Sequence, residues 1–448
     1  MADLSGVQRA ALAHLIERCP DRILSQLLGL AGAMAGDRAG AMREMVEVEL
    51  LDRRRRDVAF GPLAPLFHPR EDGLGGLDFP ADLLVRLWRA ATRGEPELLP
   101  QLDRDDDLSR MVADRLCHSA AVVLRDAPDV VWPDVGPERV ETMAACLDLA
   151  PVMRRALPYL PAWIGRPGVA ELAELKLALR QASAVGPGGV ERLLEIVFAH
   201  MPDARLMLRV LGLIGASGRE AATGREEADR LIDRVVSALA QRAAEVVALN
   251  PAADENEHRR LAAGLNWCAE TLAEIDVALS LGTDSVWAKA VRQARLKIAL
   301  RLSEHFAAAE KAVDAVLPVE RTALAGRMTR PTPRLDQAPD LQAAAKARAL
   351  LALTGQVRDI TAVFGCEAER RQTAEALTGR LATWADEAIE RLNDGRATDE
   401  VVARKRIGLT AELLGLLGAR DASRTVRRRL AIAGSNAGAA SRASPPAA

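Results

Sequence analysis

The sequence predicts an all-α protein, and two observations lead to that prediction. The apolar residues are mainly Ala and Leu, the strongest helix formers, whereas the 448 residues include only 6 Phe, 6 Trp and 1 Tyr. Aromatic and β-branched residues favour strands, so their scarcity argues against a sheet. Apolar residues also recur at spacings of three and four, which is the period of an amphipathic helix.

Residues 1–220 are predicted to form a domain of short helices. Most Pro residues fall here, repeatedly where a helix should begin, because Pro is tolerated in a first turn and breaks a helix interior. Short connections make neighbouring helices pack as hairpins, and a solenoid-like array is an open alternative. The expected helices span 5–18, 21–35, 37–58, 80–93, 103–126, 137–149, 151–163, 167–184, 188–201 and 203–216.

Residues 221–432 are predicted to form a bundle of long antiparallel helices. Apolar residues hold steps of four and three over long stretches, as in Leu261, Leu265, Cys268, Leu272, Ile275 and Leu279. Each stripe is narrow and its opposite face is charged, so a single helix of this kind is not stable alone. The sequence PTPRLDQAP, from residue 331, predicts a break between helices. Residues 433–448 are small and polar without periodicity, and we expect a disordered tail.

The segment FHPREDGLGGLDFP, residues 67–80, is a candidate site because it gathers charged side chains in a loop. Its candidate binding residues are His68, Asp72 and Asp78. Their spacing matches neither a calcium loop nor another metal geometry. Three apolar residues in the same segment, Leu74, Leu77 and Phe79, are costly in solvent. The alternative interpretation is therefore a structural clasp that joins the helices on either side.

The acidic run DRDDD predicts an alternative function as a Mg²⁺-dependent enzyme. Asp103 and Asp107 are four apart, so on one helix they would share a face and bind metal ions that bridge a diphosphate. The chain lacks a clear second acidic motif, and few aromatic residues are available to line a cavity. Asp residues at a helix start also have a purely structural use, because the exposed N–H groups and the helix dipole stabilise them.

A basic run near the end of the chain is the remaining candidate. It consists of Arg424, Arg427, Arg428 and Arg429, which are suited to phosphates or an acidic partner. No aromatic residues are interleaved for base stacking, so nucleic acid is a less favoured ligand. Cations are also stabilising near a helix C-terminus without binding anything.

These observations together predict a non-catalytic helical interaction or scaffold protein. None of the six His lies within four residues of another, the five Cys contain no C-x-x-C pair, and no phosphate-binding loop or nucleophile motif occurs. We therefore expect no cofactor. The net charge of −2 and pI near 6.4 give no global attraction to nucleic acid.

The same sequence bears on partner and location. No signal sequence or transmembrane segment is evident, so we expect a cytoplasmic protein, and the Arg-rich composition suggests a bacterial source. Charged helix faces flanking apolar stripes predict that the partner is another protein or a second copy of this chain. The enzyme and the binder of nucleic acid or an acidic partner remain the alternatives.

Overall fold

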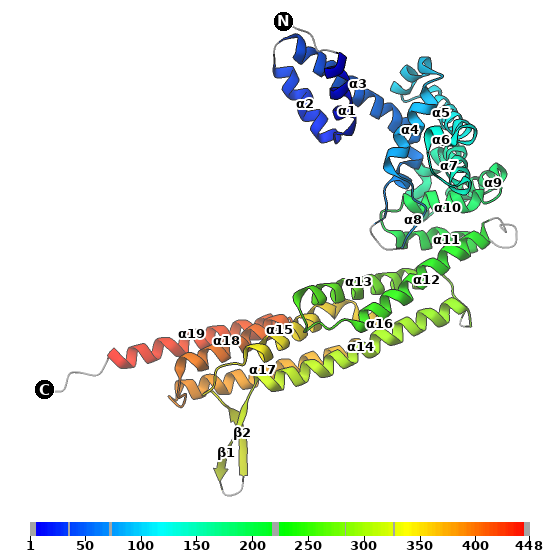
Figure 1. Cartoon of the computed structure of the whole chain (residues 1–448). Coiled ribbons are helices and arrows are strands. Elements are labelled where there is room, and N and C mark those ends of the chain that lie inside the picture. Colours follow the sequence, from blue (N-terminus) through cyan, green and yellow to red (C-terminus); the bar gives the residue numbers. More distant parts are fainter. Residues whose placement is uncertain are drawn as a thin grey trace. The chain divides into compact units, whose positions relative to one another are not determined.

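The computed structural model describes residues 6–34, 36–70, 74–216, 224–282, 284–325 and 328–442, and it confirms the all-α class (Figure 1). Within these residues the exception to helix is a hairpin of two antiparallel strands. Contacts divide the chain into two units, Met1–Ile232 and Asp233–Ala448. The two units are described separately below.

The first unit consists mainly of short helices, although one has 24 residues and two others have 20 each. It begins with the three-helix module, which we define as α1 (Gly6–Arg18), α2 (Asp21–Ala33) and α3 (Asp37–Phe60). The next elements are η1 (Gly61–Phe67), α4 (Ala81–Thr92), η2 (Pro96–Asp103), α5 (Asp107–Asp126) and α6 (Pro128–Val131). The unit continues with α7 (Pro137–Ala156), η3 (Leu157–Tyr159), α8 (Leu160–Ile164), α9 (Val169–Val185), α10 (Gly189–Ala199), η4 (Ala204–Leu206) and α11 (Met207–Ala216).

Helix α7 differs from the sequence prediction. A break was expected before Pro151, but the helix continues through it to Ala156. An interior Pro removes one backbone hydrogen bond and crowds the preceding turn. Here Leu147, Val152 and Met153 on either side of Pro151 are buried, and α7 packs against α5, α9 and α10. The burial of α7 therefore outweighs the cost of the Pro.

The second unit is built from long helices. Helix α12 (Arg225–Ala248) spans the boundary between the units and is followed by α13 (Glu255–Ala278) and α14 (Val286–Val316). After the hairpin come α15 (Leu341–Gln356), η6 (Val357–Asp359), α16 (Thr361–Phe364), α17 (Glu367–Asn393), α18 (Glu400–Leu416) and α19 (Arg420–Arg442). The predicted stripe on α13 is confirmed for Leu261, Leu265, Cys268, Leu272 and Ile275, which are all buried. Leu279, its last predicted member, lies just past the end of α13 and is partly buried.

Two features near the end of the chain were not predicted. Strands β1 (Val319–Ala325) and β2 (Met328–Pro333) form a hairpin that projects from the helices of the second unit (Figure 1). In addition, α19 continues to Arg442, so residues 433–442 are helical where the composition favours disorder. The rest of the predicted tail, residues 443–448, lies outside the described residues.

Candidate interaction site

A groove on the three-helix module is the candidate interaction site. Helices α1 and α2 both pack on α3, and their shared core contains Ile16, Leu24 and Val46. Arg53 of α3 holds the end of α1 in place, because its guanidinium donates to the backbone oxygens of Ile16, Glu17 and Cys19 at 2.8–3.1 Å. These carbonyls lie at the C-terminal end of α1, where the last carbonyls of a helix run short of backbone donors.

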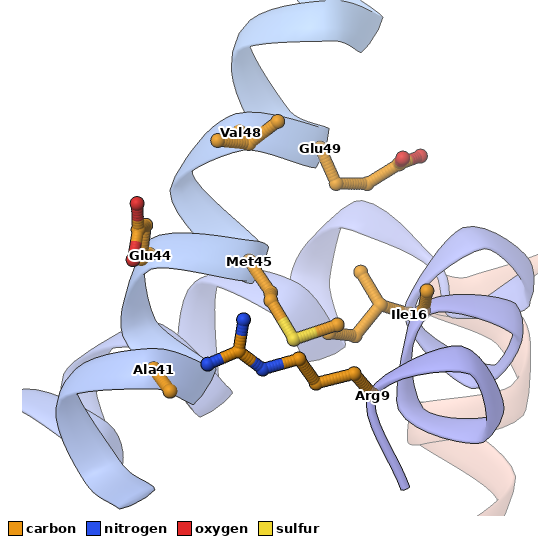
Figure 2. A pocket seen from close by; sticks show the side chains of 8 residues that line it. Arg9, Ile16, Ala41, Glu44, Met45, Val48 and Glu49 are labelled. Atoms are coloured by element: carbon orange, nitrogen blue, oxygen red, sulfur yellow. The ribbon is translucent and has the colours of Figure 1, made fainter. Parts of the chain in front are cut away.

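The groove lies between α1 and α3 and has a volume of about 360 Å³ (Figure 2). Figure 2 shows Met45 of α3 beside Ile16 of α1, with the Arg9 side chain reaching from α1 toward α3. Five of the lining residues are apolar, and the other three carry charges of both signs. Its lining consists of Arg9, Ala13, Ile16, Ala41, Glu44, Met45, Val48 and Glu49.

The three-helix module exposes several large apolar side chains beside a small core. Its core has three fully buried apolar residues, Ile16, Leu24 and Val46. Six large apolar side chains are between 44% and 83% exposed, namely Val7, Leu15, Ile23, Leu30, Met34 and Val48. Apolar surface in contact with water is unfavourable, and contiguous exposed patches mark interaction sites.

The groove was not predicted from the sequence. Ile23 and Leu30 are exposed on α2 beside the buried Leu24, but α2 contributes no residue to the lining of the groove. The groove itself depends on how α1 meets α3, which spacing along a single helix does not reveal.

The candidate ligands in the segment 67–80 do not come together. His68 is exposed, and Asp78 is exposed with its backbone oxygen accepting from Arg139 Nη2 at 2.9 Å. Asp72 lies outside the described residues. Within the residues that the structure describes, no group of three or more His, Cys, Asp or Glu side chains is arranged to hold a metal ion.

The apolar residues of the same segment match the clasp interpretation. Leu74 and Phe79 are buried and Leu77 is partly buried. The Phe79 ring lies 6.0 Å from that of Phe67 and 5.8 Å from that of Trp132. Ring pairs at this separation are favourable beyond the area they bury.

Polar contacts also fix this segment, hereafter the clasp, to α10. The guanidinium of Arg70 donates to the backbone oxygens of Phe198 and Met201 at 3.0 Å and lies over the Phe198 ring at 4.8 Å. The backbone N–H of Leu77 donates to the buried carboxylate of Glu195 at 3.2 Å. The clasp therefore joins elements that are more than a hundred residues apart in the sequence.

The two Asp residues of the metal-site alternative do not share a helix. Asp103 ends η2, whereas Asp107 begins α5, so their spacing of four does not place them on one face. Asp103 accepts two hydrogen bonds from Arg55, at 2.8 and 2.6 Å, and this contact lowers the pKa of its carboxyl. Asp107 pairs with Arg110, and the neighbouring Asp106 accepts from the Ser109 N–H as the helix cap.

The basic run on α19 is divided by its contacts. Arg424 pairs with Asp421 and Arg429 pairs with Asp386, so these two cations are already engaged. Arg427 and Arg428 are exposed, and no ion pair to them occurs among the described residues. The helix is nevertheless anchored, because Val426 on its opposite side is buried.

Comparison with known proteins finds no relative of this chain. No family model matches the chain, and neither a curated protein nor a solved structure is significantly similar to it. Among the described residues, no helix is both long enough and apolar enough to cross a membrane.

Proposed function

We propose that this protein is a non-catalytic helical interaction protein whose α1–α3 groove receives an amphipathic helix of a partner protein. The observation that carries the proposal is the exposed apolar surface of the three-helix module, where six large apolar side chains are at least 44% exposed and one of them, Val48, lines the groove. A helix with apolar residues at spacings of three, four and seven covers such a surface without any rearrangement of the fold.

The groove itself supports a helix as the partner element. Its lining includes the apolar residues Ala13, Ile16 and Met45, and apolar contact supplies the affinity of helix-in-groove recognition. Arg9 on α1 and Glu44 on α3 carry opposite charges in the same lining. Opposite charges on the two sides of a groove favour one orientation of a charged helix over the other, because the reversed orientation places like charges together.

Site-specific photo-crosslinking tests this proposal. A photoreactive amino acid replaces Val48, beside the groove, and in a second variant it replaces Val401 at the start of α18, where the native side chain is equally exposed (62% and 61%). After irradiation in the native cell, we expect discrete adducts from position 48 and none from position 401. Adding Met45→Glu, which places a charge among the apolar lining residues, should abolish those adducts.

Two results would contradict the proposal. If neither position forms an adduct, the groove has no partner under the conditions tested. If both positions form the same adducts, the contact does not depend on the groove. Circular dichroism of the Met45→Glu variant serves as the control, because an unfolded module would lose its adducts for an unrelated reason.

A further inference from the structure

The β1–β2 hairpin has two edges of different character. Residues 318 and 334 face each other in the register of the hairpin, and the Arg334 N–H donates to the Pro318 oxygen at 3.0 Å. Hydrogen-bonded and non-hydrogen-bonded pairs alternate along an antiparallel ladder. The pairs Val319 with Pro333 and Arg321 with Pro331 are therefore non-hydrogen-bonded, and their backbone groups point away from the partner strand.

Proline closes the outer edge of β2. Pro331 and Pro333 occupy the outward positions of this strand, and Pro has no N–H to offer an added strand. The outward oxygen of Pro333 is also engaged, because it accepts from Arg391 Nη1 at 2.8 Å. Proline on an edge strand is a common means of preventing further pairing.

The outer edge of β1 is open. Val319 and Arg321 are exposed, and each keeps its outward N–H and C=O. No other described group forms a hydrogen bond with these backbone atoms. The outer edge of β2 is therefore blocked by its prolines and by Arg391. The outer edge of β1 is available for pairing with an additional strand.

A pocket of about 780 Å³ lies beside this hairpin, between its base, the end of α14 and the side of α17. Its apolar lining comprises Leu317, Pro318, Val319, Pro331, Ala376 and Trp384. Its charged lining comprises three carboxylates, Asp314, Glu375 and Glu387, and one guanidinium, Arg380, which pairs with Asp314. The pocket therefore has a largely apolar lining, and its charged lining carries a net charge of −2, from three acidic groups and one basic group.

We propose that β1 binds an extended basic peptide of a partner protein by strand addition. The peptide backbone pairs with the outward groups of Val319 and Arg321. Alternate side chains of the peptide point to the same face, so an apolar residue enters the pocket while Lys or Arg residues approach Glu375. Main-chain hydrogen bonds supply the affinity of this binding mode, and the pocket supplies the specificity.

Charge favours this peptide over a second copy of β1. If β1 paired with itself about a two-fold axis, registers centred on Glu320 or Arg321 would place like charges directly opposite each other. A basic peptide instead complements the acidic pocket. The inference concerns a different surface from the α1–α3 groove and does not depend on it.

The test uses the full-length protein and a labelled synthetic peptide in which Lys, Val and Lys occupy every second position with Thr between them, so that all three face the pocket. We call it the Val–Lys peptide, and the charge control, the Val–Glu peptide, has Glu in place of each Lys. Binding is measured by fluorescence anisotropy. Arg321→Pro removes an outward N–H at a position where the ladder with β2 needs none, as Pro331 already does in β2. We expect Arg321→Pro to weaken binding of the Val–Lys peptide by at least about tenfold.

Arg321→Ala is the matched control. It removes the same positive charge but keeps the N–H, so it should bind the basic peptide as tightly as the native chain or more tightly. Glu375→Lys should weaken binding and increase the relative affinity for the Val–Glu peptide. Hydrogen exchange supplies a second readout, because the amides of Val319 and Arg321 should become protected when the peptide binds.

Three outcomes would overturn the inference. Equal affinity of the native chain and Arg321→Pro would show that the β1 edge is not used. No binding of the Val–Lys peptide, or a preference for the Val–Glu peptide, would contradict the charge assignment. A concentration-dependent dimer that Arg321→Pro abolishes would identify a second copy as the occupant in place of a partner peptide.

Discussion

The two units of this chain differ in how they satisfy the unpaired carbonyls at helix ends. The first unit has many short helices and therefore many ends, and arginines close several of them. Arg154 illustrates this, because its guanidinium donates to Val58 O and Ala59 O at the end of α3, both at 2.7 Å, while pairing with Asp114 at 3.0 Å. Arg53 and Arg70 do the same for α1 and α10.

The second unit has fewer ends for its length and depends more on continuous apolar burial. Leu377, Leu381, Ala385 and Ala388 follow one side of α17 into the core. Arg406 is a capping arginine of this unit, with Nη1 donating to Val316 O at the end of α14 at 3.4 Å and Nη2 donating to Ala338 O at 3.0 Å. The comparison indicates that irregular segments stabilise the first unit, whereas helix periodicity stabilises the second.

Removing one buried side chain from each unit tests that comparison with the largest expected effect. Phe79→Ala in the clasp should lower the free energy of unfolding by about 3–5 kcal/mol, and Leu381→Ala in α17 by about 2–5 kcal/mol. Urea denaturation gives the free energy of unfolding of each variant, and hydrogen exchange shows which helices are destabilised. We expect faster exchange in the clasp and α4 for the first variant, and in α17 and α18 for the second. A cost for Phe79→Ala below about 1 kcal/mol would contradict the clasp.

Exchanging a capping arginine for methionine in each unit should have a smaller effect. Arg154→Met leaves two carbonyls and Asp114 without their donor, and we expect a loss of about 3 kcal/mol. Arg406→Met should cost less, about 1–2 kcal/mol, because burial lowers the pKa of Arg406 and its removal recovers part of that desolvation cost. Arg155→Met is the control, because Arg155 is exposed and its loss should stay within about 0.5 kcal/mol.

Acid should weaken the second unit through His305. This side chain is buried, and desolvation lowers its pKa from 6.5 to about 4. The unfolded chain therefore binds a proton more readily, so the stabilisation is complete above pH 6.5 and is lost as the pH falls toward 4. The loss amounts to at most about 3 kcal/mol.

Unfolding free energies at several pH values test this prediction, with His305→Gln as the variant that should reduce the dependence. Burial also lowers the pKa of His200 in the first unit, where Nε2 contacts Pro62 O at 2.8 Å, so its effect has the same sign. An unchanged pH dependence in His305→Gln would show that another group is responsible.

Removing one partner of an ion pair should cause the smallest loss of stability, and the loss should be larger in the first unit than in the second. Asp103 is paired with Arg55, which is 17% exposed, whereas Glu412 in the second unit is paired with Arg348, which is 41% exposed. We expect about 1 kcal/mol for Asp103→Asn and less for Glu412→Gln. Thermal unfolding measures both. A rise in melting temperature on adding Mg²⁺ and diphosphate, abolished by Asp103→Asn, would instead support the metal-site alternative.

The apolar periodicity of the helices and several of their start positions could be predicted from the sequence, because both depend on neighbouring residues. The stripe from Leu261 to Ile275 was predicted and is buried, and proline marked the starts of α4 and α7. Pro151 misled the prediction because burial on neighbouring helices, which is not local, decided whether the helix continued. The β1–β2 hairpin was not predicted, because a segment rich in Thr, Arg and Pro has the composition of a loop.

By itself, the sequence determined the helical class, the apolar stripe of α13 and the burial of the clasp's apolar residues, since each depends on residues close together in the chain. Only the tertiary structure decided which arginine meets which carbonyl, that Asp103 faces Arg55, and that a groove lies between α1 and α3. Those contacts join residues tens to more than a hundred positions apart. Their partners are chosen by packing, which no local pattern encodes.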